Sequence, residues 1–157
     1  MEECIIHTPL GYTKITGDEN GISSIIILNS EEKITEILPT ELEDCAQQLK
    51  EYFEGKRTHF DLHLNPEGTT FQKQVWNELK TIPYGKTISY LELSKQLNDV
   101  KAIRAVANAN GKNPLWIVIP CHRVMGSDGS LTGYAGGLHR KKWLLDHESP
   151  NKQQSLF

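Results

Sequence analysis

The sequence has few cysteines and no long apolar run, and each absence excludes classes of protein. Its three cysteines, Cys4, Cys45 and Cys121, share no CxxC spacing, so neither a disulfide framework nor a zinc knuckle is indicated. No stretch approaches the roughly 18 apolar residues of a membrane helix, and the first ten residues lack the basic and apolar segments of a leader peptide. We therefore expect a cytoplasmic protein that binds no membrane and keeps Cys121 as a free thiol.

Charge is unevenly distributed along the 157 residues. Residues 1–80 carry a net charge of −8 and residues 81–157 a net charge of +5. A basic second half favours a polyanionic partner for that half, although a basic surface is more often only solvated. A partner must therefore be identified from motifs.

The first part of the chain predicts a small α/β lobe. Short β-rich runs from residue 4 to residue 30 are broken by Gly and by Asp-Glu-Asn-Gly, which is typical of an antiparallel meander. Apolar residues at helical spacing predict a helix near residues 40–54, where Thr40 and Glu43 have the spacing of a capping box. Residues 59–64 alternate like a strand, and Asn-Pro-Glu-Gly marks a linker.

The rest of the chain predicts a mainly helical lobe. We place the domains at residues 1–66 and 67–150, followed by a flexible tail at 151–157. Helices are expected over residues 71–79, 89–97 and 102–110, the second of them opened by a capping box of Ser89 and Glu92. The last two are short and joined by a tight polar turn, which are the proportions of a helix-turn-helix. Arg104 is the one long cation in a helix of otherwise small residues, which favours close approach to another helix or to a nucleic-acid groove.

Cys121 and His122 stand side by side in the stretch NPLWIVIPCHRV, residues 113–124. Residues 117–119 predict a buried strand that ends at Pro120, because proline cannot donate to a sheet ladder. In a strand, adjacent side chains would point to opposite faces, so a loop after Pro120 is the simpler way to present both groups. Taken alone, such a pair is more often a buried cysteine beside a surface histidine.

Five separated segments, FQKQVWNEL, YGKTISYLEL, RAVANANGKNP, IPCHRV and YAGGLHRKKWLLDHE, agree in type and spacing with one family. Over residues 69–148 the chain resembles the O6-alkylguanine-DNA alkyltransferases, and the first lobe matches in length and pattern. The resemblance implies an α/β N-terminal lobe similar to ribonuclease H, with a small antiparallel sheet plus a helix, and a mainly helical C-terminal lobe with a winged helix-turn-helix. It implies single-turnover transfer of an alkyl group from O6-alkylguanine in double-stranded DNA, after base flipping, to a cysteine of the protein, and leaves O4-alkylthymine open as a second substrate.

The resemblance also assigns roles to individual residues. Cys121 is implied to be the nucleophile and alkyl acceptor, His122 its base through a bridging water, and Glu148 the acid that orients His122. Tyr90 resembles the tyrosine that binds the guanine ring and donates a proton as the base leaves. The remaining positions are implied to bind DNA or the flipped base: Arg104 replaces the flipped nucleotide, Asn113 holds the turn before the active site, the Val124 carbonyl accepts from the exocyclic amine, and Tyr134 and Ala135 wall the pocket.

Two features depart from the family. Some members have a serine where Ala135 stands, so here only a backbone N–H can reach the O6 atom. Some members bind a structural zinc through two cysteines and two histidines near the N-terminus, and Cys4 has no matching second cysteine. We therefore expect no metal. The sequence also has no Gly-rich phosphate loop, so we expect no cofactor, and we expect a monomer.

Two other functions stay open at this stage. An alkyltransferase-like protein binds the damaged base without repairing it, but such proteins lack the reactive cysteine and Cys121 stands in the matching place. A cysteine hydrolase built on Cys121 and His122 would need an oxyanion hole and would turn over, leaving no lasting mass gain on the protein.

Overall fold

The computed structural model describes residues 1–126 and 133–149, which fall into two compact units. The N-terminal unit contains Met1–Glu67 together with Pro114–Val118, and the C-terminal unit contains Gly68–Asn113 and the described residues from Ile119 onward. The domain boundary predicted between residues 66 and 67 stays a prediction, and the predicted tail at 151–157 lies outside the described residues. Among the described helices, none is long and apolar enough to cross a membrane.

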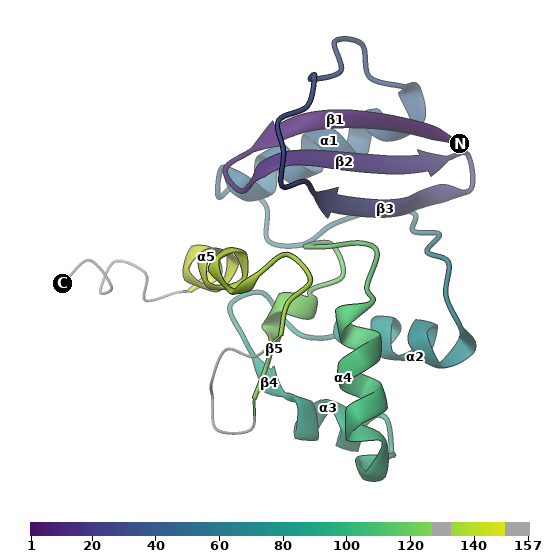
Figure 1. Cartoon of the computed structure of the whole chain (residues 1–157), viewed down its shortest axis with the longest axis vertical. Helices are drawn as coiled ribbons and strands as arrows, with labels where there is room; N and C mark the ends of the chain where they lie inside the picture. Colours follow the sequence, from purple (N-terminus) through teal and green to yellow (C-terminus); the bar gives the residue numbers. More distant parts are fainter. Residues whose placement is uncertain (127–132, 150–157) are drawn as a thin grey trace, which may run out of the picture. The chain divides into compact units, whose positions relative to one another are not determined.

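The N-terminal unit is built on a three-stranded antiparallel meander, as predicted. Strands β1 (Glu2–Thr8), β2 (Gly11–Asp18) and β3 (Gly21–Ile27) lie in the order β1-β2-β3 (Figure 1). In β2 every second residue from Thr13 is buried, so one face of the sheet forms the core of the unit. Helix α1 (Thr40–Phe53) packs on the sheet and buries Leu42, Cys45, Leu49 and Tyr52, the apolar stripe predicted for it.

Two sequence-based predictions for this unit are wrong in detail. Helix α1 begins after Pro39, whose position as N-cap leaves Thr40 inside the helix, so the predicted capping box does not form. Residues 59–64 form no regular strand; only Leu64 makes a bridge, to Ile22 in β3. Further along the same strand, Ile25 makes a second isolated bridge, to Leu115. The edge of β3 is thus covered by two short passes of the chain instead of one long strand.

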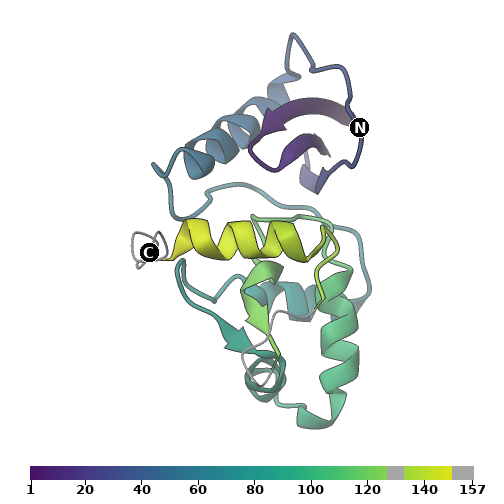
Figure 2. The same cartoon turned by 60° about the vertical axis from the view of Figure 1, so that its left-hand side comes forward.

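The C-terminal unit contains the predicted helix-turn-helix. Helix α3 (Tyr90–Gln96) is joined to α4 (Ile103–Gly111) by a 3₁₀ turn, η1 (Val100–Ala102), and α2 (Thr70–Leu79) packs on α4 (Figures 1 and 2). The indole N–H of Trp76 donates to the Ala109 carbonyl at 2.8 Å, which fixes α2 against α4. The capping box predicted from Ser89 and Glu92 is confirmed, and it sets Tyr90 as the first residue of α3.

Short parallel strands connect the start of α3 to the segment after Cys121. Strand β4 (Ile88–Ser89) pairs with β5 (Val124–Met125), in register Ile88 to Val124 and Ser89 to Met125. Between Pro120 and β5 lies a single 3₁₀ turn, η2 (Cys121–Arg123), and helix α5 (Leu138–Glu148) packs against η2. Because β4 runs directly into Tyr90 and β5 follows η2, the pairing brings Tyr90 close to the Cys-His loop.

Candidate active site

Cys121 follows two tight turns instead of the strand predicted over residues 117–119. A backbone hydrogen bond of 2.8 Å closes the first turn around Ile117, whose φ is +75°. A second one, of 2.8 Å from the Cys121 amide to the Ile119 carbonyl, closes an inverse γ-turn around Pro120 (φ −81°, ψ 63°). The strand prediction is therefore wrong, because a chain that turns twice within five residues cannot stay extended. A positive φ is strained for a β-branched residue, and such strain is common beside functional sites.

The Cys121 thiol is buried and neutral at rest. Burial raises its pKa to about 11, although the Asn113 side-chain amide and the Lys141 ammonium group both lower it. Asn113 also donates from Nδ2 to the Ile119 carbonyl at 2.8 Å, so it holds the turn that carries the cysteine. A neutral thiol is a poor nucleophile, so the site must take the proton from Cys121 as it reacts.

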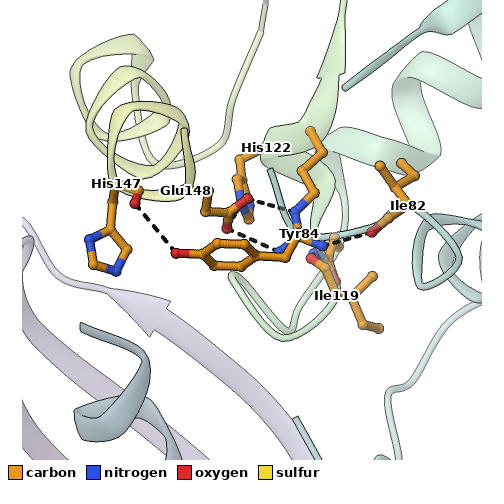
Figure 3. Close-up of polar contacts among 8 residues, drawn as sticks. Ile82, Tyr84, Ile119, His122, His147 and Glu148 are labelled. Atoms are coloured by element: carbon orange, nitrogen blue, oxygen red, sulfur yellow. Dashed lines mark hydrogen bonds and ion pairs between the residues drawn. The ribbon is translucent and has the colours of Figure 1, made fainter. Parts of the chain in front are cut away.

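His122 lies within reach of a buried carboxylate. Its Nε2 is 2.7 Å from Oε2 of Glu148, and Figure 3 shows the Glu148 side chain turned towards the ring. Arg123 completes a bidentate contact with the same carboxylate, from Nε to Oε1 at 2.7 Å and from Nη2 to Oε2 at 3.1 Å. Burial alone would raise the pKa of Glu148, but the hydrogen bonds from His122 and Arg123 and the charge of Arg123 outweigh it and hold that pKa far below its usual value.

These charges decide where the His122 proton lies. Burial lowers the pKa of His122, and the nearby Glu148 offsets this only in part, so the ring is neutral near pH 7. An ionised carboxylate accepts hydrogen bonds only, so Nε2 must carry the single ring proton. Nδ1 is then a basic lone pair; it is buried and makes no hydrogen bond with any described residue.

Arg123 is enclosed on its other side as well. Its Nη1 donates to the Ile82 carbonyl at 2.7 Å, and its guanidinium carbon lies 5.8 Å from the centre of the Tyr84 ring. The Tyr84 hydroxyl in turn donates to the His147 carbonyl at 3.4 Å, near the end of α5 (Figure 3). The last turn of α5 is therefore tied to the Cys-His-Arg turn by a set of buried polar contacts.

Tyr90 and Cys121 are linked through the side chain of Asn110. Nδ2 of Asn110, in the last turn of α4, is 3.3 Å from the Tyr90 hydroxyl and 3.4 Å from the Cys121 carbonyl oxygen. Arg104 lies elsewhere, near the start of the same helix, with an exposed side chain. Cys121 and Tyr90 therefore share a buried partner, whereas Arg104 is presented on the surface of the helix-turn-helix.

The remaining predicted residues lie on the segments around α5. The Val124 carbonyl accepts from Nζ of Lys141 at 2.6 Å, and Lys141 also donates to the Gly133 carbonyl at 3.3 Å. Tyr134 is partly buried, and burial, followed by the neighbouring Cys121, raises the pKa of its hydroxyl. Ala135 is exposed. The carbonyl assigned to base binding is thus already engaged by a buried ammonium group.

Sequence reasoning missed three polar residues of this site: Arg123, Lys141 and Asn110. Lys141 is fully buried while Lys142, the next residue of α5, is exposed and pairs with Asp146. Nothing in the sequence distinguishes the two lysines, because both lie in one basic run. For Arg123 a signal existed, since a cation inside the apolar stretch from Leu115 to Val124 must find a buried partner.

Within residues 1–126 and 133–149, no three His, Cys, Asp or Glu side chains are grouped so that they could hold a metal ion. Cys4 and Cys45 are both buried in the N-terminal unit, and burial raises the pKa of each, to about 11 and about 12. The absence of a structural metal stays a prediction.

Models of two protein domains match almost the whole chain. The DNA-binding domain of 6-O-methylguanine DNA methyltransferase matches residues 70–150, and the ribonuclease-like domain of the same protein matches residues 2–66. The chain belongs to this family. The predicted fold class, an α/β lobe similar to ribonuclease followed by a mainly helical DNA-binding lobe, is thereby confirmed.

Individual relatives match this methyltransferase over nearly the whole length of both chains. A methylated-DNA--protein-cysteine methyltransferase of Methanosarcina acetivorans is 44% identical over 94% of this chain and 98% of its own. The protein of that name from Mycobacterium tuberculosis is 42% identical over 96% of this chain and 94% of its own. Among solved structures, Mycobacterium tuberculosis OGT in complex with DNA matches with a TM-score of 0.83 and 39% identity, over 98% of each chain.

Proposed function

We propose that this methyltransferase repairs O6-alkylguanine in double-stranded DNA by moving the alkyl group irreversibly onto Cys121. The observation that carries the proposal is the buried Cys121 thiol next to a neutral His122 whose tautomer is held by Glu148. A buried, neutral thiol is inert until a base removes its proton, which suits a protein whose single reactive thiol must react only with a bound substrate.

The reaction balances without a cofactor. Nδ1 of His122 takes the Cys121 proton through one bridging water, and Sγ attacks the alkyl carbon in line. The C–S bond forms as the bond from that carbon to O6 breaks, and the electron pair of the broken bond stays on the guanine. Tyr90 donates a proton to the leaving base and recovers one from His122 through water, so the thiol proton is in effect passed to guanine. The thioether has no hydrolysable bond, so each molecule acts once.

The other predicted residues hold the DNA and the flipped base. Arg104, exposed on the recognition helix α4, is placed to enter the duplex and fill the space that the base leaves. The Val124 carbonyl can still accept from the exocyclic amine through its second lone pair, because Lys141 uses one. Tyr134 and the Ala135 backbone N–H wall the pocket near O6, and Asn113 keeps the turn before Cys121 in place.

Some predictions about the whole protein remain proposals. The cytoplasmic location is one of them, and a site formed by residues of one chain agrees with a monomer. The division into domains at residues 1–66 and 67–150 is likewise a proposal.

Peptide mapping tests the function directly. After incubation with duplex DNA carrying one O6-methylguanine, in the presence of a chelator, we expect a methyl group on Cys121 and none on Cys4 or Cys45, which lie buried in the N-terminal unit. Tight binding with no methylated peptide would indicate an alkyltransferase-like protein. Methyl on Cys4 or Cys45, or repair that leaves every cysteine unmodified, would overturn the assignment of Cys121.

A further inference from the structure

Asn110 is a buried polar residue to which the mechanism above gives no role. It lies in the last turn of α4 with 2% of its surface exposed. Its Nδ2 lies within hydrogen-bond distance of two groups of the candidate site, the Tyr90 hydroxyl at 3.3 Å and the Cys121 carbonyl at 3.4 Å. Its Oδ1 is buried and makes no hydrogen bond with any described residue.

The surroundings fix which way the Asn110 amide points. A backbone carbonyl only accepts hydrogen bonds, so the amide atom that faces the Cys121 oxygen must be the NH₂ group. The same NH₂ group faces Tyr90, and its two protons serve the two oxygens. The Tyr90 oxygen is therefore an acceptor in this contact, which does not use the proton of the hydroxyl.

We infer that Asn110 is a positioning residue for proton donation by Tyr90, an inference that rests on the alkyl transfer proposed above. As Tyr90 gives its proton to the leaving guanine, negative charge develops on the phenol oxygen. The Asn110 N–H already points at that oxygen and stabilises the charge. Hydrogen bonds to charged oxygens are shorter and roughly twice as strong as neutral ones.

The length of the contact agrees with this role. At 3.3 Å the bond to the neutral phenol is near the long limit for an N–H donor, so it contributes little in the resting protein. An interaction that strengthens only as charge develops accelerates the chemical step without tightening substrate binding. Asn110 should therefore affect the rate of transfer and not the affinity for DNA.

The unpaired Oδ1 makes a purely structural role a poor explanation. A buried acceptor without a partner is unfavourable, and a leucine of similar shape would fill the same space without it. Asn110→Leu also removes a donor from the Cys121 carbonyl, so the two effects on stability oppose each other. We expect only a small change in thermal stability.

A double-mutant cycle tests the inference. Single-turnover rates on saturating duplex DNA with O6-methylguanine are measured for the parent protein, Asn110→Leu, Tyr90→Phe and the double variant. We expect Asn110→Leu to slow transfer by about tenfold when Tyr90 is present, the value of a hydrogen bond worth roughly 1.4 kcal/mol. In the Tyr90→Phe background the same change should cost less than about twofold, because the oxygen on which Asn110 acts is gone.

The outcomes separate the inference from the function on which it rests. Equal losses in both backgrounds would mean that Asn110 supports the pocket by packing, and the inference would be overturned. A loss of DNA affinity with an unchanged rate would overturn it as well. If the parent protein itself takes up no methyl group on Cys121, the proposed function fails first. Asn77→Leu, at an exposed position of α2, is the matched control and should leave the single-turnover rate unchanged.

Discussion

Glu148→Gln is expected to slow alkyl transfer by about 10²- to 10⁴-fold while DNA affinity stays nearly unchanged. The Glu148 carboxylate accepts from Nε2 of His122 and so keeps the lone pair on Nδ1. Glutamine can accept from Arg123 with its oxygen and turn its NH₂ group to His122, which would move the ring proton to Nδ1 and remove the base. Glu148 is buried, so its replacement removes no contact with DNA. Single-turnover rates and binding titrations measure the two effects separately.

The same substitution should also destabilise the protein, and this needs a control. Arg123 is buried, and loss of its carboxylate partner leaves an uncompensated charge at a cost of about 3–5 kcal/mol. The double variant Glu148→Gln, Arg123→Met removes both charges, so most of the stability should return. The rate should stay low, because the tautomer of His122 is still uncontrolled. Recovery of the rate together with the stability would show that Glu148 acts only through the fold.

Arg104→Ala is expected to slow repair of duplex DNA by about 5-fold to 150-fold. Rotating a nucleotide out of the duplex costs a few kcal/mol in lost stacking and pairing, and an exposed arginine on α4 that fills the vacated space would offset roughly 1 to 3 kcal/mol of that cost. Reaction with the free base O6-benzylguanine needs no flipping and should change far less. Rates on both substrates, at saturating concentration, give the comparison.

A second variant controls for the lost charge. Lys101→Ala removes one exposed cation from η1, in the turn of the same motif, and should weaken DNA binding. At saturating concentration, however, it should change the rates on duplex DNA and on the free base to the same small extent. An equal loss with duplex DNA and with the free base in Arg104→Ala would show damage to the pocket. The assignment of Arg104 to base flipping would then be abandoned.

The fold was predictable where local patterns agreed with tertiary packing. The meander, the apolar stripe of α1 and the capping box of Ser89 and Glu92 all follow from short-range spacing. The predictions failed where distant contacts decide the backbone. The apolar run before Pro120 has strand composition, yet Ile117 adopts a positive φ and the chain turns there. A high strand propensity means only that side chains would fit a pleated, half-buried sheet, and it does not supply a neighbouring strand. Within the apolar run from Leu115 to Ile119, only Leu115 pairs with a strand.

The site was predictable only in part, for a related reason. Cys121 and His122 stand out as neighbours, but Glu148 lies 26 residues further on and only the family resemblance joined it to His122. No sequence pattern marks Asn110 or Lys141, because their roles depend on the burial that the fold imposes on them. Asparagine at the end of a helix and lysine on an amphipathic helix are usually solvated surface residues.

The central claim is that Cys121 is consumed in one irreversible transfer, and active-site titration tests it most directly. A fixed amount of protein is incubated with increasing excess of duplex DNA carrying labelled O6-methylguanine, and the label on the protein is counted after a long incubation. We predict a plateau at one methyl group per protein molecule, no further repair on adding fresh DNA, and no return of activity after the DNA is removed. Repair that continues beyond one equivalent would contradict the account.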